Sequence, residues 1–252
     1  MKQTSVLMPL VIVLVVVGLY PASIDAETNS EMVETGRLLA ILHDSGRVTV
    51  GSVQALINDI NKGDKGFTPV VFEERMIAKF KERSGIDLQD LQNQKVPPLA
   101  KKLLPMMVEA GKKTVATYQP IINKQGMGFK NFIPATWGTH AAAIFTAKTG
   151  FYLKQTTFDE LLRNPKNKAD QFEAATLKKF AEPAYPRVGE RVISATVDGG
   201  KAVRIMLPLF YGKGCLACHG EPKGERDISG YIREGGKEGD LGGAISVKLA
   251  LK

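Results

Sequence analysis

The sequence predicts an α+β protein in which a duplicated helical region precedes a small antiparallel sheet. Residues 31–150 carry apolar residues at helical spacing, and the pattern of this region occurs twice. Residues 151–251 instead contain short apolar runs separated by Gly, Asp and Pro, which is typical of strands joined by turns. Because helices come first and strands follow, we expect segregated layers and therefore the α+β class.

An internal repeat organises the helical region. Residues 37–88 align without a gap onto residues 102–153, at a constant offset of 65. In the clearest stretch, which begins at Gln54 and ends at Leu88, eleven of the 35 positions are identical in the two copies. An ungapped match of this length indicates an internal duplication, and two copies are too few for a solenoid.

Each copy is predicted to form a long helix, a loop and a second helix. The long helices cover residues 31–61 and 99–123, where apolar residues recur at helical spacing. The second helix of each copy should begin at a proline and end at a glycine, because these residues favour the first turn and the C-terminal cap. The residues concerned are Pro69 and Gly85 in the first copy, and Pro134 and Gly150 in the second.

The second half is predicted to form the sheet. Residues 151–156 read as a strand, and residues 172–180 as a short helix. Residues 190–197 and 201–210 flank Asp198-Gly199-Gly200, which indicates a hairpin, and residues 243–251 supply a last strand. Residues 220–242 are rich in Gly and charge, so we expect a surface loop there, with a flexible linker as the alternative.

These patterns divide the chain into three parts. Residues 1–26 form a signal peptide, residues 27–98 contain the first copy of the repeat, and residues 99–252 combine the second copy with the sheet. The long first helix has few neighbours in the sequence to cover it, and this favours a homodimer.

An export signal is expected at the N-terminus. Lys2 gives a basic start, residues 5–20 form a nearly uncharged apolar run, and Ile24-Asp25-Ala26 is a tolerable cleavage site. The run is shorter than the roughly 20 residues that a membrane-spanning helix needs. We therefore expect a cleaved signal peptide and a periplasmic protein, anchored to the membrane only if the segment is retained.

The charge balance bears on the partner. The formal net charge is +8 at pH 7, and removal of residues 1–26 leaves it unchanged. A basic surface favours an acidic protein partner, because complementary charges speed the encounter of two proteins. Nucleic acid is not expected as a partner of an exported chain without a block of Lys and Arg, and a merely solvated basic surface is the alternative.

The only two cysteines of the chain lie in one motif, Cys215-Leu216-Ala217-Cys218-His219. C-x-x-C-H is the attachment signature of c-type haem, in which both thiols bond the macrocycle and the histidine reaches the iron. A thioredoxin-like redox pair or half a zinc site would also fit two cysteines at this spacing. A zinc site, however, needs further Cys or His ligands at suitable spacing, and the chain has no other Cys.

Three further segments accompany this motif in a fixed order. They are Leu153-Lys154-Gln155-Thr156-Thr157, then Arg163-Asn164-Pro165-Lys166-Asn167 with Phe172-Glu173, and finally, after Cys215–Gly220, the run Gly239-Asp240-Leu241-Gly242-Gly243-Ala244-Ile245-Ser246-Val247. Over roughly residues 35–250 the chain thereby resembles the c-type haem family with a PAS-like fold, still largely designated a domain of unknown function. The resemblance implies a PAS-like antiparallel sheet that cradles one haem, export to the periplasm, and electron transfer or haem-based sensing.

The distal iron ligand is left open by the sequence. Some members of the family use a cysteine in the helix before the R-N-P segment, and this chain has no third cysteine. The remaining candidates are soft or nitrogenous side chains, or else a water molecule or an empty position. The side chains are His140, His43, Met106, Met107 and Met127, of which His140 lies next to the haem-bearing half.

Two other residues have alternative roles. Arg163 is a candidate for binding a haem propionate, because a guanidinium suits a carboxylate, or it is a surface residue that precedes a turn. Trp137 packs either on the haem or in the core, and we favour the core.

Three functions are compatible with such a haem. The first is a mono-haem electron carrier that docks a redox partner through its basic surface. The second is a redox or gas sensor, which we expect to signal through a separate partner because no output domain follows the last strand. The third and weakest is a peroxidase, which would need an open iron and a distal acid–base group, for which only His140 is a candidate.

Overall fold

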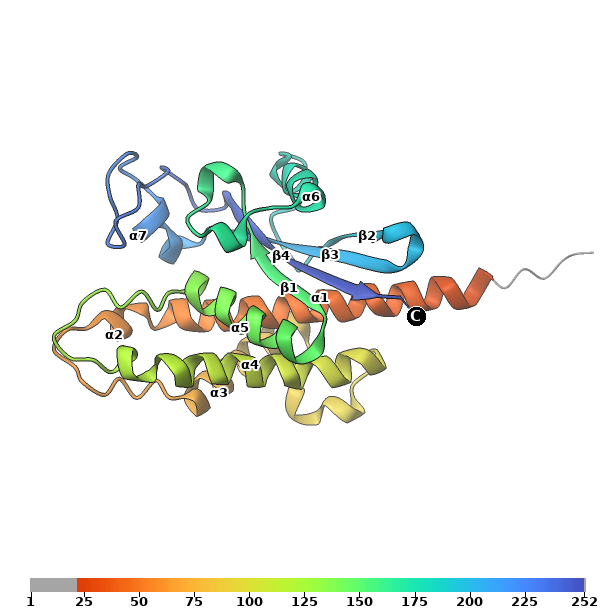
Figure 1. Ribbon diagram of the computed structural model, residues 1–252, viewed down its shortest axis with the longest axis horizontal. Coiled ribbons are helices and arrows are strands. Elements are labelled where there is room, and N and C mark those ends of the chain that lie inside the picture. The colour runs from red at the N-terminus through yellow and green to blue at the C-terminus, as the bar shows by residue number, and fades with distance from the viewer. Residues whose placement is uncertain (1–21, 252) are drawn as a thin grey trace, which may run out of the picture.

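The computed structural model describes residues 22–251, and it arranges them in three layers (Figure 1). A bundle of long helices forms one layer, a four-stranded sheet the next, and a short helix covers the outer face of the sheet. The predicted signal peptide lies outside the described residues up to residue 21, and residues 22–26 begin the first helix. In the described part of the chain, no helix is both long and apolar enough to span a membrane.

The first helix, α1 (Ala22–Ser52), is the central element of the molecule. Every residue in the stretch 38–45 is buried, because the helix contacts other helices on one side and the sheet on the other. The helices are α3 (Pro69–Ser84), α4 (Pro98–Ile122) and α5 (Pro134–Thr149). The expectation that this helix has few neighbours is therefore wrong, and the homodimer stays a prediction.

The helix boundaries follow the predicted caps. The Thr68 side chain accepts a hydrogen bond from the Val71 N–H, and proline follows in the first turn of α3. Gly85 and Gly150 end α3 and α5 with φ values of 76° and 75°, a left-handed conformation that glycine adopts without a Cβ clash. The predicted long helix over residues 31–61 is broken at Val53 and continues as the short α2 (Gln54–Asn58).

The two copies of the repeat pack against each other reciprocally. Asn58 of the first copy accepts a hydrogen bond from the Lys130 N–H of the second. Asn123, its counterpart, accepts one from the Lys65 N–H of the first. Both lysine side chains are buried, and both Nζ atoms donate to backbone carbonyls of their own loops. The duplication in the sequence therefore corresponds to two structurally equivalent halves of one bundle.

The sheet is antiparallel throughout, with the order β1-β4-β3-β2. Its strands are β1 (Tyr152–Thr156), β2 (Ile193–Val197), β3 (Ala202–Phe210) and β4 (Leu241–Ala250). The predicted hairpin is confirmed, since β2 and β3 pair across a tight connection at Asp198–Gly200. The four-stranded antiparallel sheet beside the helices confirms the predicted α+β class.

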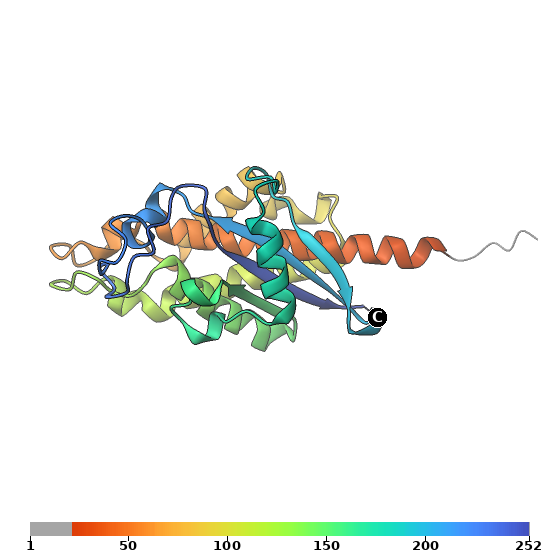
Figure 2. The same ribbon diagram turned by 90° about the horizontal axis from the view of Figure 1, so that it is seen from above.

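The two faces of the sheet are buried in different ways. Ile205 and Val247 point to the helical bundle and share one continuous core with it. That core joins residues on both sides of the expected division at residues 98 and 99. The opposite face is covered by α6 (Gln171–Ala181), which crosses the strands when seen from above (Figure 2). Because both faces are covered, the first six of the nine residues of β3 are buried.

Beneath α6, a charged network replaces part of the apolar core. Glu173 is fully buried, and its Oε1 accepts from Arg204 Nη2 and from the Tyr152 hydroxyl, each at 2.9 Å. Its Oε2 accepts from the Asp170 N–H and pairs with Lys154 at 2.8 Å. Burial of a carboxylate is tolerated because these partners satisfy both oxygens.

Candidate functional site

The C-x-x-C-H motif lies immediately after strand β3. A 3₁₀ turn, η5 (Lys213–Cys215), leads into the one-turn helix α7 (Leu216–His219). Figures 1 and 2 both place this turn at the end of the molecule where the two repeat loops lie. Cys215 is exposed and Cys218 is half-buried, and both are free thiols. The motif therefore presents both sulfurs and the histidine from a single turn near the surface.

His219 is held by two side chains at the same ring nitrogen. Its Nδ1 lies 3.0 Å from Oε2 of Glu234 and 3.2 Å from the hydroxyl of Tyr211. An ionised carboxylate can only accept a hydrogen bond, so the Glu234 contact assigns the proton of the neutral imidazole to Nδ1. The Nε2 atom then carries the free lone pair, which is what a metal ligand requires.

Tyr211 also packs against the imidazole. The two rings are stacked, with centroids 4.8 Å apart and planes 22° apart. Glycine at positions 236 and 242 makes room for the tyrosine ring, since a Cβ at Gly236 would lie 2.8 Å from its Cε2 atom and one at Gly242 closer still. The Gly236 N–H donates to the His219 carbonyl at 2.7 Å, which fixes the chain after Glu234 beside the motif. The ring of His219 is thus fixed in orientation.

Arg163 joins the motif to the segment 220–242. Its guanidinium donates to Asp227 at 2.7 Å, to Glu234 at 3.0 Å and to the Cys218 carbonyl at 3.0 Å. The same segment carries its own backbone hydrogen bonds, including Arg233 N–H to the Glu225 carbonyl at 2.8 Å. These contacts favour the predicted surface loop over a flexible linker. The pairing of Arg163 with a haem propionate stays a prediction.

Burial shifts the ionisation of Cys218 and of His219 within the motif. Burial, and then the nearby Asp227 carboxylate, raise the pKa of the Cys218 thiol. Burial is also the main cause that lowers the pKa of His219, and Arg163 lowers it further, although Glu234 opposes both. At neutral pH the site therefore offers a protonated Cys218 thiol and a neutral imidazole, and these residues fit a c-type haem.

His43 lies far inside the helical bundle. It is fully buried, its Nε2 donates to the Gly138 carbonyl oxygen at 2.9 Å, and its ring packs on Trp137. Burial is the main cause that lowers its pKa to about 4. His43 is therefore a core residue, and its candidacy as a distal ligand is wrong because the bundle would have to open for it to reach an iron.

His140 is exposed on α5 and is directed toward α4. Its Nε2 lies 3.1 Å from the Tyr118 hydroxyl, and the two rings meet edge to face. Its neighbour Thr139 instead bonds Asn167, which belongs to the sheet side of the molecule. The role of His140 as a distal ligand stays a prediction, and it would require exchange of the contact with Tyr118 if Nε2 were the ligating atom.

The methionine candidates and Trp137 are placed by packing. Met107 and Trp137 are both fully buried in the core, which confirms the prediction for the tryptophan. Met106 is partly buried against the same core, and Met127 is 36% exposed in the second repeat loop. Burial in the bundle makes Met107 a packing residue, and of the methionine candidates Met127 is the most accessible.

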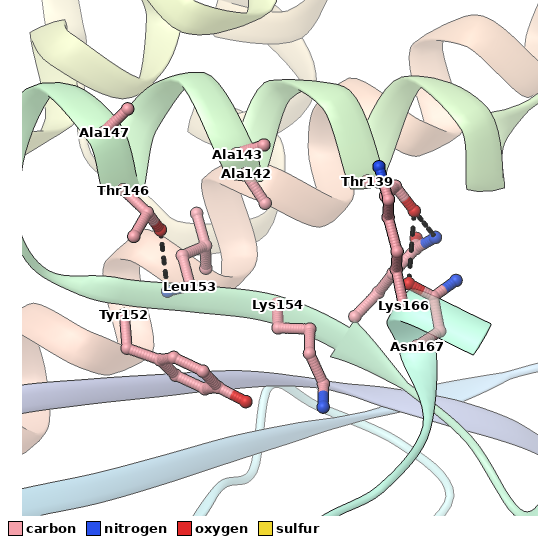
Figure 3. Close-up of a pocket in the computed structure, with 11 residues that line it drawn as sticks. Thr139, Ala142, Ala143, Thr146, Ala147, Tyr152, Leu153, Lys154, Lys166 and Asn167 are labelled. Atoms are coloured by element: carbon pink, nitrogen blue, oxygen red, sulfur yellow. Dashed lines mark hydrogen bonds between the residues drawn. The ribbon is translucent and has the colours of Figure 1, made fainter. Parts of the chain in front are cut away.

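A separate cleft of about 410 Å³ lies between α5 and β1 (Figure 3). Its wall on α5 is made of small side chains, among them Ala142, Ala143 and Thr146, and Asn167 lies at its other side. Figure 3 shows Lys154 directed away from α5, toward its partners on the outer face of the sheet. None of the residues that line this cleft is Cys, His or Met, and the hydroxyl of Tyr152, which does line it, donates to Glu173.

Tyr211 and Glu234 were missed by the sequence reasoning. Glu234 is one of several acids in a Gly-rich segment, and it lies 15 residues beyond the histidine that it contacts. Tyr211 follows directly on a strand, a position that has no signature of its own. Only the folding of the segment 220–242 back onto α7 brings these residues to His219.

The fold and the site together define a class of protein. It is an α+β protein with a C-x-x-C-H motif at one end of an antiparallel sheet, whose histidine is oriented by a tyrosine and a carboxylate. Residues 123–250, slightly more than half of the chain, match the Tll0287-like family. The protein belongs to the Tll0287-like family.

One solved structure is similar in part. The crystal structure of the cyanobacterial heme-protein Tll0287 is 16% identical in sequence, with a TM-score of 0.43. The similarity covers 62% of this chain and 97% of that chain. A comparison with curated proteins finds no match.

Proposed function

We propose that this protein is a periplasmic c-type cytochrome that carries single electrons, with one haem bonded to Cys215 and Cys218 and with His219 as the proximal ligand. One observation carries the proposal: two free thiols and an imidazole with an available Nε2 lie on a single turn near the surface. Membership of the Tll0287-like family supports it, since the namesake of that family is a heme-protein.

The haem would supply a one-electron Fe(III)/Fe(II) couple, and the residues of the chain would determine how it is held. Cys215 and Cys218 would anchor the macrocycle through thioether bonds. His219 would offer Nε2, because Glu234 and Tyr211 hold the opposite nitrogen and prevent rotation of the ring. Arg163 would hold the loop against the motif.

The position of the motif supports electron exchange with another protein. Cys215 is exposed, so a haem bonded to it would have an edge close to solvent and to a partner. The net charge of +8 favours an acidic one-electron redox protein as that partner. In each encounter one electron would pass between the partner and the haem iron, with no bond made or broken in the protein.

A PAS-like arrangement of the sheet and a sensing role form the second candidate. The four-stranded antiparallel sheet has α6 on one face and α1 on the other, and the haem motif follows directly on its central strand β3. Gly36 of α1 packs so closely on Ile205 of β3 that a Cβ would lie 2.5 Å from its Cδ1 atom. A ligand change at the haem would therefore be transmitted from β3 to α1 through a tightly packed contact. This favours signalling through a separate partner.

Optical spectra of the purified holoprotein test both candidates. We expect a Soret band that survives acid–acetone extraction, and its loss in the double variant Cys215→Ala/Cys218→Ala. Because the chain has no other cysteine, this variant removes every site of thioether attachment. A wild-type protein without a covalently retained haem would overturn the proposal.

Carbon monoxide then separates the carrier from the sensor. A low-spin ferrous spectrum that carbon monoxide does not change supports the electron carrier, because both axial positions are then strongly ligated. In that case His140→Ala and Met127→Ala would identify the distal ligand by a change to a high-spin spectrum. Ready binding of carbon monoxide would favour the sensor or a peroxidase, and would contradict the carrier.

A further inference from the structure

Glu234 and Arg163 form a chain of contacts that ends at the histidine of the motif. Oε2 of Glu234 lies 3.0 Å from Nδ1 of His219, and its Oε1 lies 3.0 Å from Nη2 of Arg163. The side chains of Glu234 and Arg163 are each only 19% exposed, so neither is a mobile surface charge. Each carboxylate oxygen therefore has one partner, and the group is fixed between a cation and an imidazole.

The geometry points to Glu234 as a positioning residue that binds the Nδ1 proton of His219 and lowers the reduction potential of the haem. This inference rests on the proposed function and identifies a residue that adjusts the reduction potential of the haem at that site. An anionic acceptor at Nδ1 draws the proton toward itself and gives the imidazole partial imidazolate character. A more basic ligand stabilises Fe(III) over Fe(II), and this lowers the potential.

Tyr211 modifies this effect without adding charge. Its hydroxyl lies 3.2 Å from the same Nδ1, so it competes with Glu234 as an acceptor for the one proton. Burial is the main cause that raises the pKa of Tyr211 above its ordinary value, and the phenol stays neutral at physiological pH. The carboxylate at 3.0 Å is both the closer and the charged acceptor, and it should receive the stronger hydrogen bond.

A redox titration of three holoprotein variants tests the inference. Glu234→Gln removes the charge and keeps the side-chain length, and we expect a shift of the haem potential to a higher value. Glu238→Gln is the matched control, because it removes one negative charge from an exposed residue of the same loop. Tyr211→Phe removes the competing acceptor and keeps the ring stacked on His219, so we expect a small shift to a lower potential.

The outcomes separate the inference from the proposed function. If wild-type protein retains no covalent haem, the proposed function fails and the inference fails with it. If the haem is covalent but Glu234→Gln and Glu238→Gln shift the potential equally, only the inference is overturned. The loss of any negative charge near the haem would then explain the shift. If Glu234→Gln does not assemble, Tyr211→Phe decides: a lower potential supports the inference, and an unchanged or higher potential overturns it.

Discussion

Gly46 of α1 lies against the indole ring of Trp137, and its repeat counterpart Gly111 of α4 contacts the same ring. A Cβ at Gly111 would lie 2.8 Å from Cζ2 of the indole, and a Cβ at Gly46 would lie closer still. The Nε1 of Trp137 donates to the Gly111 carbonyl at 3.3 Å. The two long helices of the repeat can therefore approach each other only because both carry glycine where the tryptophan lies.

Gly46→Ala should destabilise the bundle. The added methyl group has no space beside the rigid indole, and overpacking of this kind costs about 1–3 kcal/mol or more in the free energy of unfolding. Gly51→Ala is the matched control on the same helix, where the nearest atom, Cγ of Pro134, would be 3.3 Å from the new Cβ. Urea unfolding should show a large decrease in the free energy of unfolding for Gly46→Ala and a change within about 1 kcal/mol for Gly51→Ala. Equal decreases in the two variants would contradict the packing argument.

Glu173→Gln should destabilise the sheet beneath α6. The substitution leaves Arg204 and Lys154 without their shared anionic partner, and breaking a buried ion pair costs about 3–5 kcal/mol. Glu182→Gln makes the same chemical change at an exposed residue just after α6 and should cost little. Thermal or urea unfolding of the two variants gives the comparison. A loss below about 1 kcal/mol for Glu173→Gln would show that the network is not needed for stability.

His43 should make the protein less stable in mild acid. Its folded pKa of about 4 lies below its unfolded value of 6.5, so the unfolded chain binds the proton first as the pH falls. Its contribution is therefore fully present above pH 6.5, and it is lost progressively between pH 6.5 and pH 4. The full loss amounts to about 3 kcal/mol.

Urea unfolding of the wild type and of His43→Gln at several pH values measures this contribution. Glutamine keeps a donor for the Gly138 carbonyl and does not titrate. The wild type should lose more stability than the variant between pH 6.5 and pH 4. Parallel curves for the two proteins would show that His43 does not remain neutral in the folded state.

Arg163→Ala should loosen the loop over residues 220–242. The substitution removes the contacts to Asp227, Glu234 and the Cys218 carbonyl, which tie this loop to the motif. Limited trypsin digestion should then cleave at Lys223, Arg226 or Arg233 several-fold faster than in the wild type. Arg187→Ala is the control, because Arg187 is exposed and stacks on Phe210 outside this loop. Equal cleavage rates in both variants would mean that the loop is held by its own hydrogen bonds.

Local signals in the sequence determined much of this protein. The proline and glycine caps located α3 and α5, and the Asp-Gly-Gly turn located the β2–β3 hairpin, because such signals act through the backbone of a few adjacent residues. The motif placed Cys215, Cys218 and His219 on one turn for the same reason. The repeat also predicted two equivalent halves, and the reciprocal bonds of Asn58 and Asn123 bear this out.

Only the tertiary structure decided which residues meet across long distances in the chain. It buried the middle of α1 between the other helices and the sheet and placed His43 in the core, because the sheet closes over a helix that the sequence alone left uncovered. It also brought Glu234 and Arg163 to the motif of His219. The contacts that hold them join residues 55 to 71 positions apart in the chain, and the loop they fix shows no periodicity in the sequence. Such contacts depend on the assembled layers, and no local propensity encodes them.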